Sequence, residues 1–184
     1  MARLAALETV LRRWAPRINL VSRATLEDLW ARHIADSAQL ADLAPPRPGV
    51  WLDLGSGAGF PGLVIAAILA ERAPDCRVIL IESDARKCAF LHAAAREMDV
   101  SVAIETARIE AAQPHQADVI SARALAALDI LLGLAARFCR PGTVLLFPKG
   151  RTVETELTEA RRHWHIEARL HASRTDPLGR IVEV

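Results

Sequence analysis

The sequence lacks the features that would mark a membrane or secreted protein. No apolar run reaches the roughly 18 residues that a helix needs to cross a bilayer. The opening residues, MARLAALETVLRRW, place charges among apolar positions, whereas a secretory signal carries an unbroken apolar stretch. We therefore expect no membrane segment and a cytoplasmic location.

Cysteine and lysine are scarce. The three cysteines, Cys76, Cys88 and Cys139, form no C-x-x-C pair, which favours reduced structural thiols. Closely spaced zinc ligands are missing as well, so we expect no metal. The only lysines are Lys87 and Lys149, so arginine, whose planar fork suits phosphate, carries most of the positive charge. A genome biased toward arginine and alanine explains this composition equally well.

An excess of charge of either sign is also missing. The net charge is +1 over 184 residues, so the field of the whole molecule indicates neither nucleic acid nor membrane as a partner. The apolar fraction of 52% is typical of a globular protein. At this length we expect a single domain and no requirement for an oligomer.

The pattern of the chain changes at PPRPG, residues 45–49. Before it, apolar residues at helical spacing predict a helical segment over 1–44, whose second helix has Thr25 as its N-cap. After it, an α/β core over 50–184 is expected. Its predicted strands are 50–54, 77–82, 101–105, 117–122 and 143–150, and its predicted helices are 61–72, 84–98, 125–138 and 153–163. With a C-terminal hairpin, this pattern predicts a doubly wound, mostly parallel seven-stranded sheet.

The stretch VWLDLGSGAGFPGL, residues 50–63, places an acid and four glycines directly after the first core strand. Residues 57–62 satisfy G-x-G-x-x-G, the pattern of a dinucleotide site. Read from Asp53, the same stretch is D-x-G-x-G-x-G, the pattern of a loop that holds S-adenosylmethionine. Ligands of doubly wound sheets lie beyond the carboxyl ends of the strands, which is where this loop falls.

Asp53 and Glu82 favour S-adenosylmethionine. A pyrophosphate needs a helix N-terminus without a negative neighbour, whereas the cationic methionine end of S-adenosylmethionine favours a carboxylate such as Asp53. In addition, Gly55-x-Gly57-x-x-Phe60 fails the dinucleotide pattern. Glu82 closes the second strand, where its two oxygens can accept hydrogen bonds from ribose hydroxyls. A tight turn that binds nothing is the remaining alternative.

Four segments make a resemblance to a known family specific: INLVSRATLEDLWARHIADS (18–37), LDLGSGAGFPGL (52–63), ISARAL (120–125) and FPKG (147–150). Along essentially the whole chain, the sequence resembles the small-subunit ribosomal RNA guanine-N7 methyltransferases, also called glucose-inhibited division protein B. The resemblance implies transfer of a methyl group from S-adenosylmethionine to N7 of a guanine in 16S rRNA of the small ribosomal subunit. Members of this family usually carry more chain ahead of Ile18.

The resemblance also implies cofactor contacts at Gly55, Phe60, Ile109, Glu110 and Arg123. Together with the residues predicted from the loop pattern and the end of the second strand, Asp53, Gly57, Gly59 and Glu82, these make up the predicted cofactor site. Ile109 and Glu110 follow the third strand, where an apolar side chain can pack on adenine and a polar group can meet its edge. Arg123 follows a buried strand, and its alternative role is an ion pair with an acid such as Asp118 or Asp53.

Guanine N7 carries a lone pair and no proton, so methyl transfer to it needs no general base. We expect catalysis by positioning and electrostatic support, with Arg123 and Lys149 as candidates. Lys149 either meets a phosphate or is a solvated loop lysine. His33 and Asp36 are expected mainly to pack and hydrogen-bond against the sheet. A basic RNA-binding face is less favoured than an ordinary solvated surface for the arginines at 12, 13, 17, 23 and 32.

Three other functions stay open at this point. One is a methyltransferase of the same fold that acts on a small molecule. The second is an NAD-dependent oxidoreductase, which the G-x-G-x-x-G pattern permits. The third is a non-catalytic RNA-binding module that holds S-adenosylmethionine only as a structural ligand.

Overall fold

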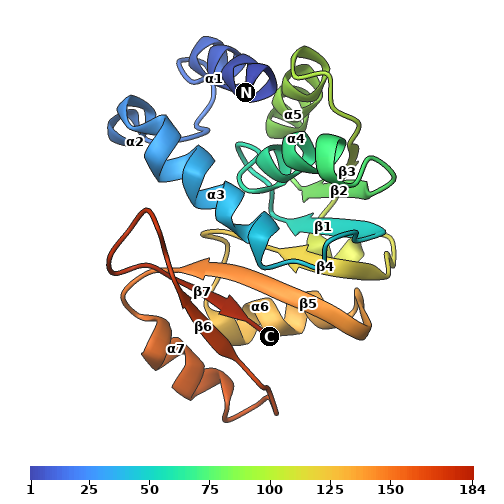
Figure 1. Ribbon diagram of the computed structural model, residues 1–184, viewed down its shortest axis with the longest axis vertical. Helices are drawn as coiled ribbons and strands as arrows, with labels where there is room; N and C mark the ends of the chain where they lie inside the picture. The colour runs from blue at the N-terminus through green and yellow to red at the C-terminus, as the bar shows by residue number, and fades with distance from the viewer.

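The computed structural model describes the backbone of residues 1–184 and all side chains except those of Arg23 and Ala24. Its centre is one seven-stranded sheet with the order β3-β2-β1-β4-β5-β7-β6 (Figure 1). The first five strands run parallel to their neighbours, and β7 pairs antiparallel with both β5 and β6. The predicted doubly wound, mostly parallel seven-stranded sheet is therefore confirmed. The strands are β1 (Val50–Leu54), β2 (Arg77–Glu82), β3 (Ala103–Thr106), β4 (Ala117–Ser121), β5 (Cys139–Lys149), β6 (Arg169–Ala172) and β7 (Arg180–Glu183).

Helices cover both faces of the sheet because its central strands are apolar on both sides. Alternate residues of β1 enter opposite cores: Trp51 joins one cluster of buried side chains, and Leu52 and Leu54 join the other. On the Trp51 face lie α4 (Gly62–Arg72) and α5 (Ala85–Glu97). On the other face lie α6 (Leu128–Ala136) and α7 (Val153–Ala160). The two cores fix the carboxyl ends of β1, β2 and β4 at one edge.

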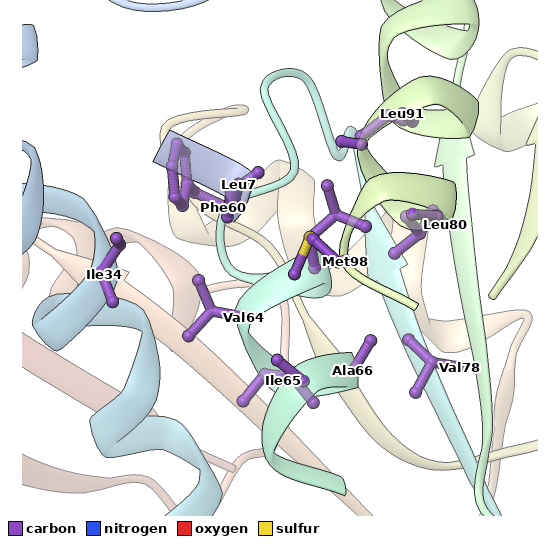
Figure 2. Packing of buried hydrophobic residues seen from close by; sticks show 14 of the residues in the cluster. Leu7, Ile34, Phe60, Val64, Ile65, Ala66, Val78, Leu80, Leu91 and Met98 are labelled. Carbon is purple, nitrogen blue, oxygen red and sulfur yellow. The ribbon is translucent and has the colours of Figure 1, made fainter. Parts of the chain in front are cut away.

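The N-terminal segment packs on the core of the Trp51 face (Figure 1). Its elements are α1 (Ala2–Trp14), α2 (Arg23–Glu27), the π-helical turn η1 (Trp30–Ala35), α3 (Asp36–Ala38) and the 3-10 turn η2 (Gln39–Asp42). Figure 2 shows Leu7 and Ile34 of this segment in one cluster with Phe60, Val64 and Leu80. This burial anchors the segment beside the loop that follows β1.

Thr25 is not the N-cap that the sequence predicted. Ser22 caps α2, because its Oγ accepts a hydrogen bond from the Thr25 backbone N–H at 3.2 Å. The predicted second helix is also not one regular helix, since α2 ends at Glu27 and a wider π-helical turn follows at Trp30. That turn carries His33, and Asp36 begins α3 directly after it.

The boundary error that bears on the site lies after β4. The predicted helix 125–138 begins only at Leu128, because Ala124 has φ +53° and breaks the helical path. Leu125 instead lies over Gly55, where a Cβ on the glycine would come within 2.7 Å of the leucine side chain. The loop of residues 122–127 is therefore part of the site.

Within the described residues, no helix is both long and apolar enough to cross a membrane.

Candidate functional site

The glycine loop, residues 55–62, joins β1 to α4 at the carboxyl edge of the sheet. Gly55, Gly57 and Gly59 have φ values of +65°, +54° and +81°, a region that side chains rarely adopt. The loop is further fixed by Ser56, whose N–H donates to the carbonyl of Ile81 at 3.0 Å. The glycines thus let the backbone fold tightly over the end of β1.

A cavity of about 640 Å³ lies above this loop, at the crevice expected for a doubly wound sheet. We call it the first cavity. Its size is typical of small-molecule sites, which span roughly 300–1,000 Å³. Of the predicted contacts, those that line it are Gly55, Gly57, Phe60, Glu82, Ile109, Glu110 and Arg123. Asp53, Gly59 and Lys149 do not line it.

Glu82 is held rigidly at the end of β2. Its Oε2 accepts a hydrogen bond from the Gly57 N–H at 2.9 Å, and its Oε1 accepts one from the Asp84 N–H at 2.8 Å. The side chain is buried, yet it lines the first cavity. The two hydrogen bonds orient the carboxylate before any ligand binds. Each of its oxygens can still accept a further hydrogen bond from a ligand.

Asp53 is placed differently from our expectation. It is fully buried beneath the loop, so the direct contact with a cation in the first cavity is not formed by its side chain. Its Oδ1 accepts a hydrogen bond from the Ser121 hydroxyl at 2.7 Å. Its Oδ2 faces the backbone of Gly62 without a well-formed hydrogen bond. Burial raises the pKa of Asp53 to about 6, although the bond from Ser121 opposes the shift.

Arg123 joins the end of β4 to the N-terminal segment. Its guanidinium donates to His33 Nδ1 at 2.8 Å and to Asp36 Oδ2 at 3.4 Å. It also lies 5.2 Å from the centre of the Phe60 ring. The acid beside it is therefore Asp36, and Asp118, one of the two we had named, pairs with Arg140 instead.

His33 and Asp36 both hydrogen-bond to Arg123, in agreement with the expected contacts to the sheet, and His33 also stacks on Phe60. The His33 ring lies 5.0 Å from the Phe60 ring at an interplanar angle of 19°. Burial and the nearby Arg123 charge lower the pKa of His33 to about 4, so the imidazole is neutral at pH 7. Asp36 accepts a further hydrogen bond from Thr175 Oγ1 at 2.8 Å, which links it to the C-terminal strands.

Lys149 is neither a solvated loop lysine nor a free phosphate ligand. Its Nζ donates to the Ala126 carbonyl at 2.7 Å and lies 2.8 Å from Glu156 Oε2, and its side chain is only 9% exposed. Glu156 in turn accepts a hydrogen bond from the Leu128 N–H at 2.9 Å. This buried pair holds both ends of the segment that runs from the loop after β4 into α6.

Arg137 and Ser121 are site-supporting residues that the sequence analysis missed. Arg137, just after α6, donates to the carbonyls of Ile109 and Ala112 at 3.1 Å each and so fixes the turn that lines the cavity after β3. An arginine after a long apolar helix was the available signal. Ser121 links Asp53 to the indole N–H of Trp51, which donates to its hydroxyl at 2.9 Å.

The arginines of the N-terminal segment were expected to form an ordinary solvated surface rather than a basic RNA-binding face. Arg12, Arg13, Arg17 and Arg32 are exposed, and Arg12 forms an ion pair with Glu8. Arg32 alone of these four lines the first cavity. The side chain of Arg23 lies outside the described residues. Among the side chains that are described, no three potential ligands gather as a metal ion would require.

The fold is shared with solved methyltransferase structures. The chain aligns with an O-methyltransferase from Bacillus cereus, solved in complex with SAH, at a TM-score of 0.66 and 16% identity over 97% of this chain and 90% of that one. It also aligns with a Thermus thermophilus 16S rRNA N2 G1207 methyltransferase, solved in complex with AdoMet and guanosine. The TM-score is 0.59 and the sequence identity 20%, over 82% of this chain and 38% of that one. These low identities establish the fold alone.

Sequence relatives give a narrower result. The chain is 53% identical to the ribosomal RNA small subunit methyltransferase G of Rhodospirillum centenum over 99% of this chain and 82% of that relative. It is 48% identical to the protein of the same name from Ruegeria sp. over 100% of this chain and 89% of that relative. A family model, GidB, described as rRNA small subunit methyltransferase G, matches residues 1–176. The chain therefore belongs to the GidB family of small-subunit ribosomal RNA methyltransferases.

Proposed function

We propose that this protein transfers a methyl group from S-adenosylmethionine to N7 of a guanine in 16S rRNA of the small ribosomal subunit. The observation that carries the proposal is the first cavity of a GidB-family chain, with Glu82 fixed at one end and Arg123 at the other. Since ribosomal RNA is the proposed acceptor, we expect the reaction in the cytoplasm. No metal and no oligomer are needed for it.

The lining of the first cavity fits S-adenosylmethionine. Glu82 has acceptor capacity for two ribose hydroxyls, and Ile109 offers an apolar surface to the adenine ring. Gly57 leaves open space where a side chain would stand, since an added Cβ would meet nothing closer than 3.7 Å. S-adenosylmethionine supplies a methyl group activated by a sulfonium cation.

Asp53 supports a cationic ligand from below. A buried carboxylate without a cationic partner is costly, and its pKa near 6 reflects that cost. A cation in the first cavity would favour the ionised form through a medium that screens little. This indirect coupling replaces the contact that we predicted from the sequence.

The proposed chemistry demands positioning rather than proton transfer. Guanine N7 is already a nucleophile, and neutral His33 is engaged as an acceptor from Arg123. Arg123 and the loop of residues 122–127 would orient the acceptor against the methyl group. Arg123 therefore acts as a positioning candidate, and Lys149 acts one step further away, through the loop that it holds.

The alternatives are less well supported. A dinucleotide would set a pyrophosphate above Asp53, whereas a cation would relieve the buried charge there. The family relation also disfavours an oxidoreductase, a small-molecule methyltransferase and a non-catalytic RNA-binding module.

The test is transfer of radiolabelled methyl from S-adenosylmethionine to small ribosomal subunits that lack the modification, followed by identification of the labelled nucleoside. Label in 7-methylguanosine is expected. Label in another nucleoside would refute the N7 assignment. Transfer to a small molecule only, or no transfer despite cofactor binding measured by calorimetry, would refute the proposed substrate.

A further inference from the structure

A second cavity, of about 360 Å³, adjoins the first. Asp36, Arg123 and Ala124 line both, so the two cavities meet where β4 ends. The far side of the second cavity consists of the end of β5 and the turn between β6 and β7. In the strand order this is the side away from Glu82 and β2.

Most charges in the second cavity neutralise one another. Arg123 pairs with Asp36, and Lys149 pairs with Glu156. The remaining charged residues of its lining are Asp176 and Arg180. Among the residues whose side chains are described, neither of these two forms an ion pair within 4.0 Å. Two opposite charges therefore share one cavity without bonding to each other.

The turn between β6 and β7 keeps these two charges apart. Asp176 Oδ1 accepts a hydrogen bond from the Leu178 N–H at 2.9 Å. Arg180 Nη1 donates to the carbonyls of Pro177 at 3.1 Å and Gly179 at 2.7 Å. Each side chain is oriented by backbone of the same turn. This leaves Asp176 Oδ2, the second lone pair of Asp176 Oδ1 and the other guanidinium nitrogens of Arg180 for a ligand.

The remaining walls suit a flat ring. Ala124, Ala126, Pro148 and Ile181 line the second cavity with small or apolar surfaces. Ala124 is held at φ +53°, a strained conformation that persists where the surrounding structure enforces it. The Lys149–Glu156 pair fixes Ala126 and Leu128, just after Ala124 in the same loop.

We propose that the second cavity is the acceptor-nucleotide subsite, in which Asp176 recognises the N1–H and N2–H edge of an unstacked guanine and Arg180 binds a phosphate of the RNA. This inference rests on the proposed function. Guanine is the base that presents two adjacent N–H donors to a carboxylate, whereas adenine and cytosine present a ring lone pair on that edge. Arginine is well matched to phosphate oxygens.

The orientation agrees with attack through N7. In a purine, N7 lies on the five-membered ring, away from the 2-amino group. Asp176 belongs to the far turn of the second cavity, so a guanine held there by its N1 and N2 edge directs N7 toward the junction with the first cavity. Asp176 and Arg180 are therefore specificity-determining residues for the acceptor.

Two measurements test this subsite. Asp176→Asn should lower kcat/KM for methyl transfer to small subunits by about 10- to 100-fold, with S-adenosylmethionine affinity unchanged. Arg180→Gln should raise KM and reduce the salt dependence of RNA binding by about one phosphate contact. Separately, 5′-GMP and 5′-IMP are titrated into the protein saturated with S-adenosylhomocysteine. Wild type should prefer GMP because IMP lacks the 2-amino group, and Asp176→Asn should lose that preference.

Matched controls separate the subsite from general charge effects. Asp75→Asn and Arg169→Gln remove one charge each outside both cavities and should leave all readouts unchanged. An unaltered GMP preference in Asp176→Asn, or no GMP binding to wild type at millimolar concentration, would overturn the proposal. If wild type transfers no methyl to ribosomal RNA, the proposed function fails, whereas the nucleotide titration still decides the subsite.

Discussion

Both cavities draw their linings from several parts of the chain, but only the first has one continuous stretch, the glycine loop, as its floor, through residues 55–58 and Phe60. The lining of the second comes from Asp36, residues 123–126, residues 148–150, Glu156 and residues 173–181. The first is shaped by backbone, through glycines with positive φ. The second is shaped by side-chain ion pairs. The local sequence therefore fixes the floor of the proposed cofactor site, whereas the proposed acceptor subsite depends on tertiary packing alone.

The largest expected effect concerns the ion pair behind the second cavity. Lys149→Met should lower the free energy of unfolding by about 3 kcal/mol, because it leaves Glu156 without its cation in a poorly hydrated site. Methyl transfer should fall further than S-adenosylmethionine affinity, since the loop of residues 122–127 loses its anchor. Urea unfolding and steady-state kinetics measure the two effects.

The double variant Lys149→Met with Glu156→Gln should recover most of that stability, because no uncompensated charge remains. Arg151→Met, at an exposed neighbouring position, serves as the control. Equal losses of methyl transfer and cofactor affinity in the single variant would show that the pair does not act on the second cavity in particular.

A glycine comparison probes the first cavity. Gly59→Ala should cost about 2–3 kcal/mol, because its Cβ would come within 2.4 Å of Leu63 in addition to the strain of φ +81°. Gly57→Ala has the same kind of φ strain but no contact closer than 3.7 Å, so about 1 kcal/mol is expected. Thermal unfolding of both variants measures the difference, and similar losses would contradict this account of the loop.

Asp53, buried beneath the glycine loop, should make the stability of the protein depend on pH. Its folded pKa of about 6 lies above its ordinary value of 3.8, so its stabilising contribution is complete below pH 3.8 and is lost as pH rises through 6. Asp53→Asn should therefore stabilise the ligand-free protein at pH 7.5 by about 1–3 kcal/mol, while it weakens S-adenosylmethionine binding. Unfolding curves at pH 4 and 7.5, with calorimetry of cofactor binding, test both parts. If Asp53→Asn bound S-adenosylmethionine with unchanged affinity, Asp53 would not contribute to the proposed cofactor site.

The smallest effect is expected at His33, where the two cavities meet the N-terminal segment. Its pKa of about 4 lies below its ordinary 6.5, so the stability it contributes is present above pH 6.5 and is lost as pH falls toward 4. After discounting for solvent screening, His33→Gln should reduce the acid destabilisation between pH 6.5 and 4 by about 1 kcal/mol. Chemical unfolding of wild type and variant at pH 5 and 8 measures this. If the free energy of unfolding changed equally between the two pH values in both proteins, the imidazole of His33 would be solvated rather than buried.

The contrast between the cavities also explains what the sequence predicted. The bounds of β1 and β2 and the place of the glycine loop follow from local patterns, so they agree with the structure. Lys149 could not be interpreted correctly, because its partners Ala126 and Glu156 belong to two other elements. Nor does an acid at the end of an apolar strand reveal whether it faces the ligand or, as Asp53 does, lies buried beneath the loop.

Residues near the C-terminus of the chain hydrogen-bond to residues of the N-terminal segment. Asp36 and Gln39 are bonded by Thr175 and by the N–H of Arg174, and the turn that follows supplies Asp176 and Arg180. During synthesis, the glycine loop is therefore present long before the groups that close the site beside it. A chain released before residue 173 would contain the glycine loop without the acceptor side that we propose. It would also lack Ile181 and Val182 of β7, which belong to the two cores, so the same C-terminal residues contribute to folding and to the proposed subsite.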